Sequence, residues 1–207
     1  MDTYAYILGD NMYINLTNLC TNDCIFCIRS LNDKVAGSDL NLTSEKINVE
    51  DVISQIKEKM SPNVHEIVFC GYGEPLIKLD LIKEIAAFVK KTYPDIPTRI
   101  NTNGQANVIH KKDVTKELKT LIDKISISLN SDNAKQYQEL SRSKFGESIY
   151  EEVKDFAKLC CEVGIDTSLS IVTGYKDKVI NVENCKKIAD SMGAKLKVRE
   201  WLDEGYN

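Results

Sequence analysis

Three closely spaced cysteines occur near the start of the chain, in the stretch CTNDCIFC. Cys20, Cys24 and Cys27 follow a short apolar segment with the spacing C-x3-C-x2-C. A loop of this length can place three thiolates on three corners of a cubane iron–sulfur cluster, whereas most [4Fe–4S] clusters take four cysteines. Three ligands leave one iron open to an exogenous ligand, as catalytic metal sites generally do. The spacing therefore favours a cluster with one open iron.

Two other uses of these thiols remain open. Structural zinc usually requires four ligands, and the two histidines, His65 and His110, lack finger-like spacing to the cysteines. A redox dithiol at Cys24 and Cys27 would leave Cys20 without a role. No second cluster-like spacing exists among the remaining cysteines, three of which lie in helical patterns and are predicted to be small buried hydrophobes. These remaining residues are Cys70, Cys160, Cys161 and Cys185.

The composition limits the class of protein. The chain has 207 residues, a formal net charge of −4 and 43% hydrophobic residues, which suits one soluble domain over residues 1–207. The sequence shows no signal peptide and no apolar run of about 20 residues, so we expect a cytoplasmic protein without membrane association. In that compartment the seven cysteines are better interpreted as metal ligands or free thiols than as disulfides. The mild acidity does not indicate a nucleic-acid partner.

Short apolar strands alternate with amphipathic helical patterns along the chain. Strands are predicted at residues 12–17, 66–70, 98–101, 124–130, 167–172 and 195–200. Helices are predicted at 49–60, 78–91, 111–121, 147–163 and 181–192. Six strands joined by crossover helices imply a parallel sheet with right-handed connections. Because a full barrel of eight units needs about 250 residues, we expect a partial (β/α)6 TIM-type barrel, six-stranded and laterally open. A flat doubly wound sheet is the alternative.

Several predicted strands carry small polar residues on one face. Ser126, Ser128 and Asn130 alternate with apolar residues, and Ser168 and Ser170 do the same in a later strand. A barrel filled by its own side chains would favour Val, Ile and Leu at inward positions. We therefore expect a polar lumen that holds a ligand; a solvent-exposed sheet face is the simpler alternative.

Two glycine-containing motifs follow predicted strands. In FCGYGEPLI, Gly71 and Gly73 permit a tight turn and a close approach of the backbone, and Glu74 supplies a carboxylate for an ammonium group. In NTNG, residues 101–104, a polar strand end is followed by a glycine turn. Taken alone, each motif is also compatible with an ordinary connection between a strand and a helix.

The cysteine loop resembles that of the radical S-adenosylmethionine (SAM) superfamily, C-x3-C-x-aromatic-C, with Phe26 at the aromatic position. The resemblance implies a [4Fe–4S] cluster held by Cys20, Cys24 and Cys27, with SAM chelating the open iron. It further implies reductive cleavage of SAM to methionine and a 5′-deoxyadenosyl radical, which abstracts hydrogen from a substrate. Such an enzyme would be oxygen-sensitive and would need a flavodoxin or ferredoxin as electron donor.

The second and third motifs resemble further signatures of this superfamily. Gly71, Gly73 and Glu74 match the glycine–glutamate motif that binds the SAM amino group, with Tyr72 as a variation on Gly-Gly-Glu. The NTNG stretch resembles a Thr-Asn-Gly signature. Its candidate cofactor-binding residues are Asn101, Thr102 and Asn103.

The ends of the later strands supply the remaining candidates that the resemblance implies. Ser128 and Asn130 would lie against the ribose and carboxylate of SAM, and Thr173 would border the adenine. Arg142 offers a guanidinium for the methionyl carboxylate, although a solvated surface arginine is an equal alternative. The ordered motifs NLTNLC, EIVFCGYGEP, RINTNG, SISLNS and KFGE most resemble the TatD-family-associated radical SAM proteins.

The reaction itself stays open at this point. A glycyl-radical-enzyme activase and a 7-carboxy-7-deazaguanine synthase-like enzyme are alternatives with similarly short chains. A metal-binding scaffold without turnover and a subunit that binds SAM without acting alone are alternatives outside this class. The first three cysteines are common to all of these hypotheses.

Overall fold

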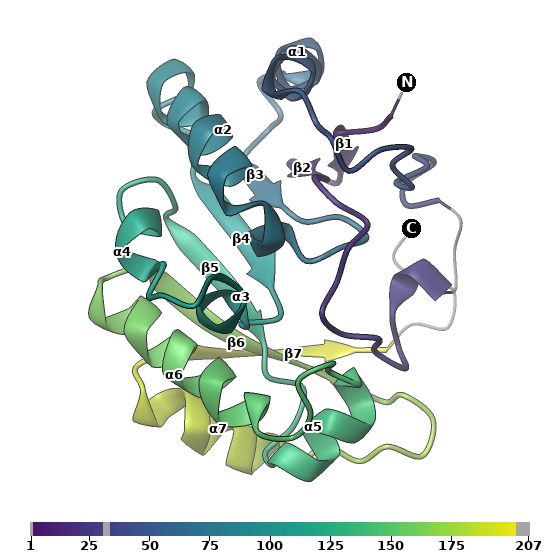
Figure 1. The fold of residues 1–207 in the computed structure, drawn as a ribbon, viewed down its shortest axis with the longest axis vertical. Helices are drawn as coiled ribbons and strands as arrows, with labels where there is room; N and C mark the ends of the chain where they lie inside the picture. Colours follow the sequence, from purple (N-terminus) through teal and green to yellow (C-terminus); the bar gives the residue numbers. More distant parts are fainter. Residues whose placement is uncertain (1, 31–33, 202–207) are drawn as a thin grey trace.

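The computed structural model describes residues 2–30 and 34–201, which form a seven-stranded sheet in the order of the sequence (Figure 1). The strands are β1 (Ala5–Leu8), β2 (Asn11–Ile14), β3 (Glu66–Phe69), β4 (Thr98–Thr102), β5 (Lys124–Ser128), β6 (Asp166–Thr173) and β7 (Lys195–Glu200). Strands β2 to β7 are parallel, and β1 forms an antiparallel hairpin with β2. A doubly wound sheet reverses its strand order at a switch point, and this sheet does not. The predicted partial, laterally open barrel is therefore confirmed.

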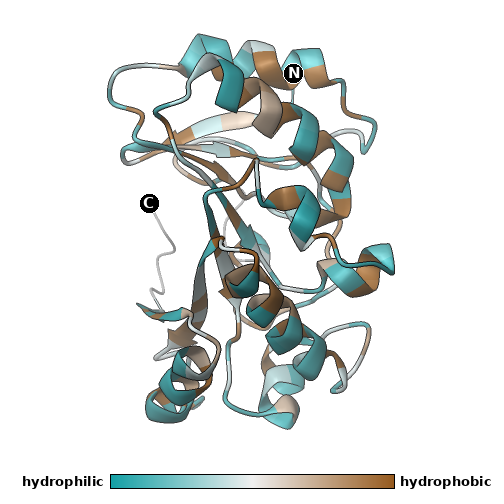
Figure 2. Ribbon diagram, turned by 90° about the vertical axis from the view of Figure 1, so that its left-hand side faces the viewer, coloured by the Kyte–Doolittle hydropathy of each residue, from teal (hydrophilic) through white to brown (hydrophobic). Residues whose placement is uncertain are grey.

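Helices connect the parallel strands and cover the outer side of the sheet (Figure 1). They are α1 (Val49–Lys59), α2 (Leu79–Thr92), α3 (Ala106–His110), α4 (Thr115–Leu118), α5 (Ala134–Ser141), α6 (Ile149–Glu162) and α7 (Val182–Ser191), with 3-10 turns η1 (Ile28–Ser30) and η2 (Pro75–Lys78). The longer helices are amphipathic, and Figure 2 shows hydrophilic and hydrophobic stretches alternating along them. In α1, for example, Asn48 accepts a hydrogen bond from the Glu50 amide, while Val52 and Ile56 are fully buried. Among the described helices, none combines the length and apolarity that a membrane crossing requires.

The two faces of the sheet differ in chemistry. The helix-facing side contributes Ile67, Ile125 and Leu169 to one hydrophobic core, in which Tyr137, Phe69 and Phe156 are the largest fully buried side chains. The opposite, inner side carries the alternating polar positions of β4 to β7. The helices thus pack on one face, and the other face is left to line the lumen.

Three sequence predictions need correction. The sequence pattern predicts neither the hairpin strand β1 nor the helix α5. The predicted helix at 111–121 is wrong: α3 ends at His110, its C-cap Lys111 has a left-handed φ of 54°, and α4 begins only at Thr115. Between them, the Asn107 and Asp113 side chains accept hydrogen bonds from the amides of Val114 and Thr115. These local side-chain bonds interrupt the helical periodicity.

Candidate functional site

A cavity of about 220 Å³ lies at the carboxyl ends of the parallel strands, beside the cysteine loop. This end of a parallel barrel is where its enzymes place their active sites. Ten of the predicted site residues line the cavity: Cys20, Cys24, Phe26, Gly73, Glu74, Asn101, Thr102, Asn103, Ser128 and Asn130. The topology therefore brings together residues separated by more than 100 positions in the chain.

The three cysteine thiols lie in one loop and influence each other electrostatically. Burial, together with the neighbouring Cys27 and Cys20, raises the pKa of Cys24 to about 12. Cys20 is exposed as a residue, yet desolvation around its sulfur also raises its pKa. Its Sγ accepts a hydrogen bond from the Asn22 amide at 3.4 Å, and the Asn103 Nδ2 lies 4.0 Å away. Hydrogen bonds to the sulfurs are one of the means by which proteins tune iron–sulfur clusters.

The cysteine loop is fastened to the body of the protein by backbone hydrogen bonds. The amides of Asp23 and Ile25 donate to the carbonyls of Ser141 and Leu140 at the end of α5. On the other side, the Tyr175 hydroxyl donates to the Ile25 carbonyl at 2.7 Å. The Tyr175 ring also makes an edge contact with Phe26, with centroids 5.9 Å apart. The loop conformation is therefore defined by contacts on both sides of the cysteines.

A fully buried glutamine, Gln105, joins the loop to the third motif. Its Oε1 accepts a hydrogen bond from the Thr21 hydroxyl at 2.6 Å. Its Nε2 donates to the Asn22 side chain at 2.8 Å, and to Tyr137 and Ser143 at 3.1 and 3.2 Å. A buried amide with this many partners fixes the relative positions of the groups around it. No sequence motif marked Gln105, because its role depends on partners 32 to 84 residues away.

Gly73 allows the second motif to pack directly on the cysteine loop. A Cβ at this position would lie 2.4 Å from the Thr17 carbonyl oxygen and 2.5 Å from that of Leu19. The next amide, of Glu74, donates to the same Leu19 carbonyl at 2.8 Å. Any side chain at position 73 would therefore push the motif away from the loop.

The Glu74 carboxylate is buried and connects the second motif to the third. Oε1 accepts hydrogen bonds from the Leu76 amide and the Thr102 hydroxyl, and Oε2 accepts one from the Asn103 amide at 2.6 Å. Two carboxylate oxygens offer about four lone-pair positions, so one position on Oε2 remains for a further donor. Burial raises the pKa of Glu74 to about 7, against the lowering effect of these three hydrogen bonds.

Five predicted site residues lie outside the wall of this cavity. Gly71 and Tyr72 line a neighbouring cavity, and Cys27 lies in the loop behind Cys24. Arg142 is the C-cap of α5, with its side chain 60% exposed and 3.9 Å from Asp23. The Thr173 hydroxyl donates to the Arg199 carbonyl at 3.4 Å on the last strand pair.

Five residues that were not among the predicted site residues line the cavity: Asn22, Cys70, Ser126, Ser170 and Arg199. Ser126 and Ser170 belong to the polar strand faces that indicated a lumen, so the alternation already carried a signal for them. The Ser126 hydroxyl is buried and has no hydrogen-bond partner within the described part of the chain. Such an orphaned polar atom in a cavity wall is suited to a polar ligand.

The cavity wall fits a cluster and an amino-acid-like ligand beside it. Over residues 2–30 and 34–201, no three His, Cys, Asp or Glu side chains converge closely enough to hold a single metal ion. A cubane places each thiolate on a separate iron corner, so the thiols of a loop need not converge on one point. The free position on Glu74 and the orphaned Ser126 hydroxyl offer polar contacts to a ligand next to it.

Comparisons with solved structures show the same fold in larger proteins. SuiB of Streptococcus suis, bound to its precursor peptide SuiA, superposes with a TM-score of 0.66 and 21% identity, over 92% of this chain and 39% of that one. The hydrogenase maturase HydG of Carboxydothermus hydrogenoformans gives a TM-score of 0.64 and 18% identity, over 94% and 46% of the two chains.

Sequence comparisons find similarity to longer archaeal enzymes. A probable GTP 3′,8-cyclase of Methanocaldococcus jannaschii is 26% identical over 197 residues, which are 93% of this chain and 59% of the relative. The 7-carboxy-7-deazaguanine synthase of the same organism is 30% identical over 101 residues, 43% of this chain and 41% of the relative. The chain therefore spans less than two thirds of each of these relatives.

The sequence profile of the radical SAM superfamily matches residues 14–191. This match includes the cysteine loop and every strand from β3 to β6. The chain belongs to the radical SAM superfamily, enzymes that use a [4Fe–4S] cluster and S-adenosylmethionine.

Proposed function

We propose that this enzyme cleaves SAM reductively to methionine and a 5′-deoxyadenosyl radical, which abstracts hydrogen from a substrate still to be identified. The observation that carries the proposal is the packing of the Cys20–Cys24–Cys27 loop against Gly73 and Glu74. In this contact the thiols of Cys20 and Cys24 and a buried carboxylate border one cavity, and Cys27 belongs to the same loop. We propose a single core domain, residues 1–207, for this chemistry.

Each motif has a distinct task in the proposal. The three cysteines hold the cluster, and Glu74 accepts a hydrogen bond from the SAM ammonium at its remaining Oε2 position. The strand-end residues Asn101, Thr102 and Asn103 shape the wall on which the methionyl part lies. Their contribution is orientation, because Thr102 and Asn103 are themselves fixed by the Glu74 carboxylate.

The later strands contact the nucleoside part in the proposal. Ser128 and Asn130 offer hydroxyl and amide groups to the ribose, with Asn130 held by a bond from its Nδ2 to the Ser141 hydroxyl at 3.2 Å. Phe26 shields the cavity from water on the loop side, since its ring packs on Tyr175. Thr173, Arg142, Gly71 and Tyr72 lie farther out and are assigned supporting roles.

The electron donor and substrate are proposed at a coarser level. The Cys20 side of the loop is exposed, which suits the approach of a flavodoxin or ferredoxin in a reducing cytoplasm. The similarity to a 7-carboxy-7-deazaguanine synthase and to probable GTP 3′,8-cyclases supports a small heterocyclic substrate as the second candidate function. Membership of the TatD-associated subgroup is proposed on the motif order alone.

Anaerobic reconstitution tests this function. The protein is loaded with iron and sulfide, reduced with dithionite and supplied with SAM, and 5′-deoxyadenosine is measured by chromatography. We expect product with the wild type and none with Cys24→Ala, while Cys161→Ala, a half-buried cysteine on α6, retains it. A zinc-loaded protein that leaves SAM unchanged would instead establish the scaffold alternative.

A further inference from the structure

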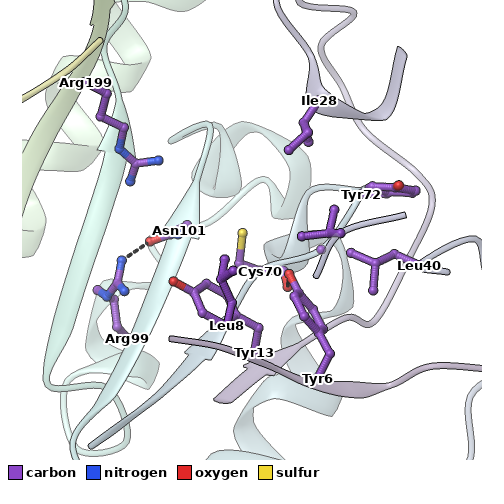
Figure 3. Close-up of a pocket in the computed structure, with 12 residues that line it drawn as sticks. Tyr6, Leu8, Tyr13, Ile28, Leu40, Cys70, Tyr72, Arg99, Asn101 and Arg199 are labelled. Atoms are coloured by element: carbon purple, nitrogen blue, oxygen red, sulfur yellow. Dashed lines mark hydrogen bonds between the residues drawn. The ribbon is translucent and has the colours of Figure 1, made fainter. Parts of the chain in front are cut away.

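A second, larger cavity of about 460 Å³ adjoins the first. The two share Cys70, Asn101 and Arg199 in their walls. Its size falls in the range of sites for small ligands, roughly 300–1,000 Å³. The second and third motifs contribute Cys70, Gly71, Tyr72 and Asn101 to this cavity, and its other side chains come from β1, β2, β4, β7 and the segment after the cysteine loop (Figure 3).

One wall of the second cavity is aromatic and aliphatic. The rings of Tyr6 and Tyr13 stack with centroids 5.3 Å apart and an interplanar angle of 27°. The Tyr6 hydroxyl is held by the Cys70 carbonyl at 3.3 Å, so this ring is fixed in place. Leu8 and Leu40 extend the same wall. A rigid, flat apolar surface of this kind suits an aromatic ring.

The facing wall is cationic, as Figure 3 shows for Arg99 and Arg199. Arg99 is engaged by Glu66 at 2.8 Å and by Asn101 at 2.7 Å. Within the described part of the chain, the half-buried guanidinium of Arg199 makes no hydrogen bond or ion pair. A guanidinium has five N–H donors, and Arg199 borders both cavities. It can therefore donate hydrogen bonds to an anion bound in either cavity.

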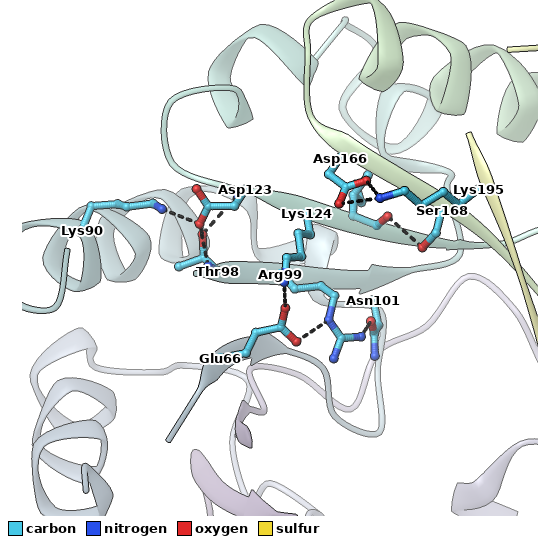
Figure 4. A network of polar contacts seen from close by, with 11 residues as sticks. Glu66, Lys90, Thr98, Arg99, Asn101, Asp123, Lys124, Asp166, Ser168 and Lys195 are labelled. Carbon is cyan, nitrogen blue, oxygen red and sulfur yellow. Dashed lines mark hydrogen bonds and ion pairs between the residues drawn. The ribbon is translucent and has the colours of Figure 1, made fainter. Parts of the chain in front are cut away.

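Positive charge exceeds negative charge along the inner face of β4 to β7. Five cations lie there, Arg99, Lys124, Lys195, Lys197 and Arg199, with two carboxylates, Asp166 on β6 and Glu66 on the neighbouring β3; Figure 4 shows both carboxylates with Arg99, Lys124 and Lys195. Burial, and then the charges of Arg99 and Arg199, lower the pKa of Lys197. The cations are therefore close enough to repel one another, and a bound anion would relieve this repulsion.

Protection of an edge strand is the simpler explanation of inward-pointing charges on β7. It suffices for Lys195, which is paired with Asp166 at 2.8 Å at the start of the strand. It does not account for Arg199, which lies near the other end and borders two cavities. Its position relative to the tyrosine wall requires a separate explanation.

We propose that the second cavity binds the substrate, and that the substrate is a flat aromatic molecule carrying a carboxylate or phosphate. The ring lies against Tyr6 and Tyr13, and the anionic group binds Arg199. This inference rests on the proposed function of the first cavity, because the shared wall places the ligand beside the position assigned to SAM. Arg199 is then a determinant of substrate specificity.

Calorimetric titration of the protein without cluster or SAM tests the inference independently of turnover. The probes are 2-naphthoate, 2-naphthyl phosphate and the neutral 2-naphthamide, which share one ring. We expect both anions to bind about tenfold or more tightly than the amide, as charge-assisted hydrogen bonds require. Whichever anion binds more tightly identifies the preferred group.

Three variants separate the anion site from general effects. Arg199→Gln should reduce the affinity for both anions to that for the amide. Arg199→Lys should retain part of the difference in affinity between the anions and the amide. Lys187→Gln, an exposed residue on α7 that removes the same charge, should change nothing. Tyr13→Leu should weaken all three probes alike. Thermal unfolding of each variant verifies that it is folded.

Equal binding of amide and anions, no binding by any probe, or an unchanged affinity in Arg199→Gln would overturn the inference. Failure of the proposed function gives a different result: the naphthalene anions still bind, but the reconstituted protein forms no 5′-deoxyadenosine. If Arg199→Gln weakens only SAM binding, Arg199 belongs to the first cavity and the substrate inference is wrong.

Discussion

The two neighbouring cavities are built in different ways. In the first, the polar groups are bound to one another: the Glu74 carboxylate accepts three hydrogen bonds, and Gln105 bonds four partners. In the second, Arg199 shows no such bond in the described part of the chain, and its opposite wall is stacked tyrosine. The first is a preorganised polar frame, whereas the second offers an aromatic surface and an available cation.

This difference corresponds to what each cavity must do under our proposals. A site for a cofactor common to many enzymes needs fixed donors and acceptors. A site for a particular substrate depends on a few side chains whose identity can change without disturbing that frame. Breaking the frame should therefore affect cluster binding and SAM affinity, and changes at residues that line only the second cavity, such as Tyr13, should leave both unchanged.

Loss of a cluster ligand should have the largest effect on the first cavity. Cys24→Ala removes one of the three thiolates assigned to the cluster, so we expect loss of bound iron and of visible absorbance after reconstitution. The naphthalene anions should still bind this variant, because Cys24 lines the first cavity and not the second. Loss of both iron binding and naphthalene-anion binding would show that the two cavities depend on each other.

Gln105→Leu should weaken the frame without removing a ligand. The substitution leaves buried partners of the amide unsatisfied, and we expect the free energy of unfolding to fall by about 2–3 kcal/mol. Iron should also be lost faster to a chelator, because the loop loses the hydrogen bonds that join Thr21 and Asn22 to Gln105. Gln136→Leu, which removes a glutamine bonded to Ser131 and Val179, is the control. Equal iron loss in both variants would remove Gln105 from its positioning role.

Glu74→Gln should reduce SAM affinity by about tenfold or more while the cluster stays intact, since it removes the acceptor proposed for the ammonium. Calorimetric titration of the reconstituted protein measures this effect. Glu117→Gln, a carboxylate paired with Lys83 and Lys112 outside the cavity, is the matched control. Unchanged affinity in Glu74→Gln would exclude Glu74 from SAM binding.

The same residue should give the protein without SAM a characteristic pH dependence. The pKa of Glu74 is raised from 4.5 to about 7 in the folded state. The folded protein therefore retains a proton that the unfolded chain releases, and stability should fall as the pH rises from 4.5 to about 7, by about 3 kcal/mol for this group. Urea unfolding across this range should show the slope in the wild type and lack it in Glu74→Gln. Parallel profiles would contradict the assignment.

Arg142→Gly should have the smallest effect. Arg142 has a φ of 46° at the end of α5, a conformation that glycine adopts without strain. We expect the free energy of unfolding to rise by about 0.5–1 kcal/mol in urea titrations. Because its side chain lies outside the first cavity, SAM affinity should change less than about twofold. A large loss of affinity would instead support binding of the methionyl carboxylate by Arg142.

The sequence was sufficient for features that depend on local patterns. The partial barrel follows from the alternation of strands and helices, and ten predicted residues line one cavity because each lies at the carboxyl end of a strand or in the segment after it. The prediction of a helix at 111–121 is wrong because hydrogen bonds that the Asn107 and Asp113 side chains accept from the backbone override the apolar periodicity.

The second cavity was not predictable from these patterns. Tyr6 belongs to a hairpin strand that precedes the first predicted element, and Arg199 lies in the last strand, 193 positions away along a 207-residue chain. Only the curvature of the sheet brings them to one cavity. Gln105 was missed for a related reason, since a lone buried glutamine has no sequence signature.

Electron paramagnetic resonance of the reduced protein tests the central claim most directly. We predict that the reconstituted, dithionite-reduced protein shows a [4Fe–4S] signal that changes when SAM is added, because three cysteines leave one iron open. The change should require higher SAM concentrations in Glu74→Gln. A cluster signal that SAM leaves unaltered at saturation would contradict the assignment of the first cavity as the SAM site.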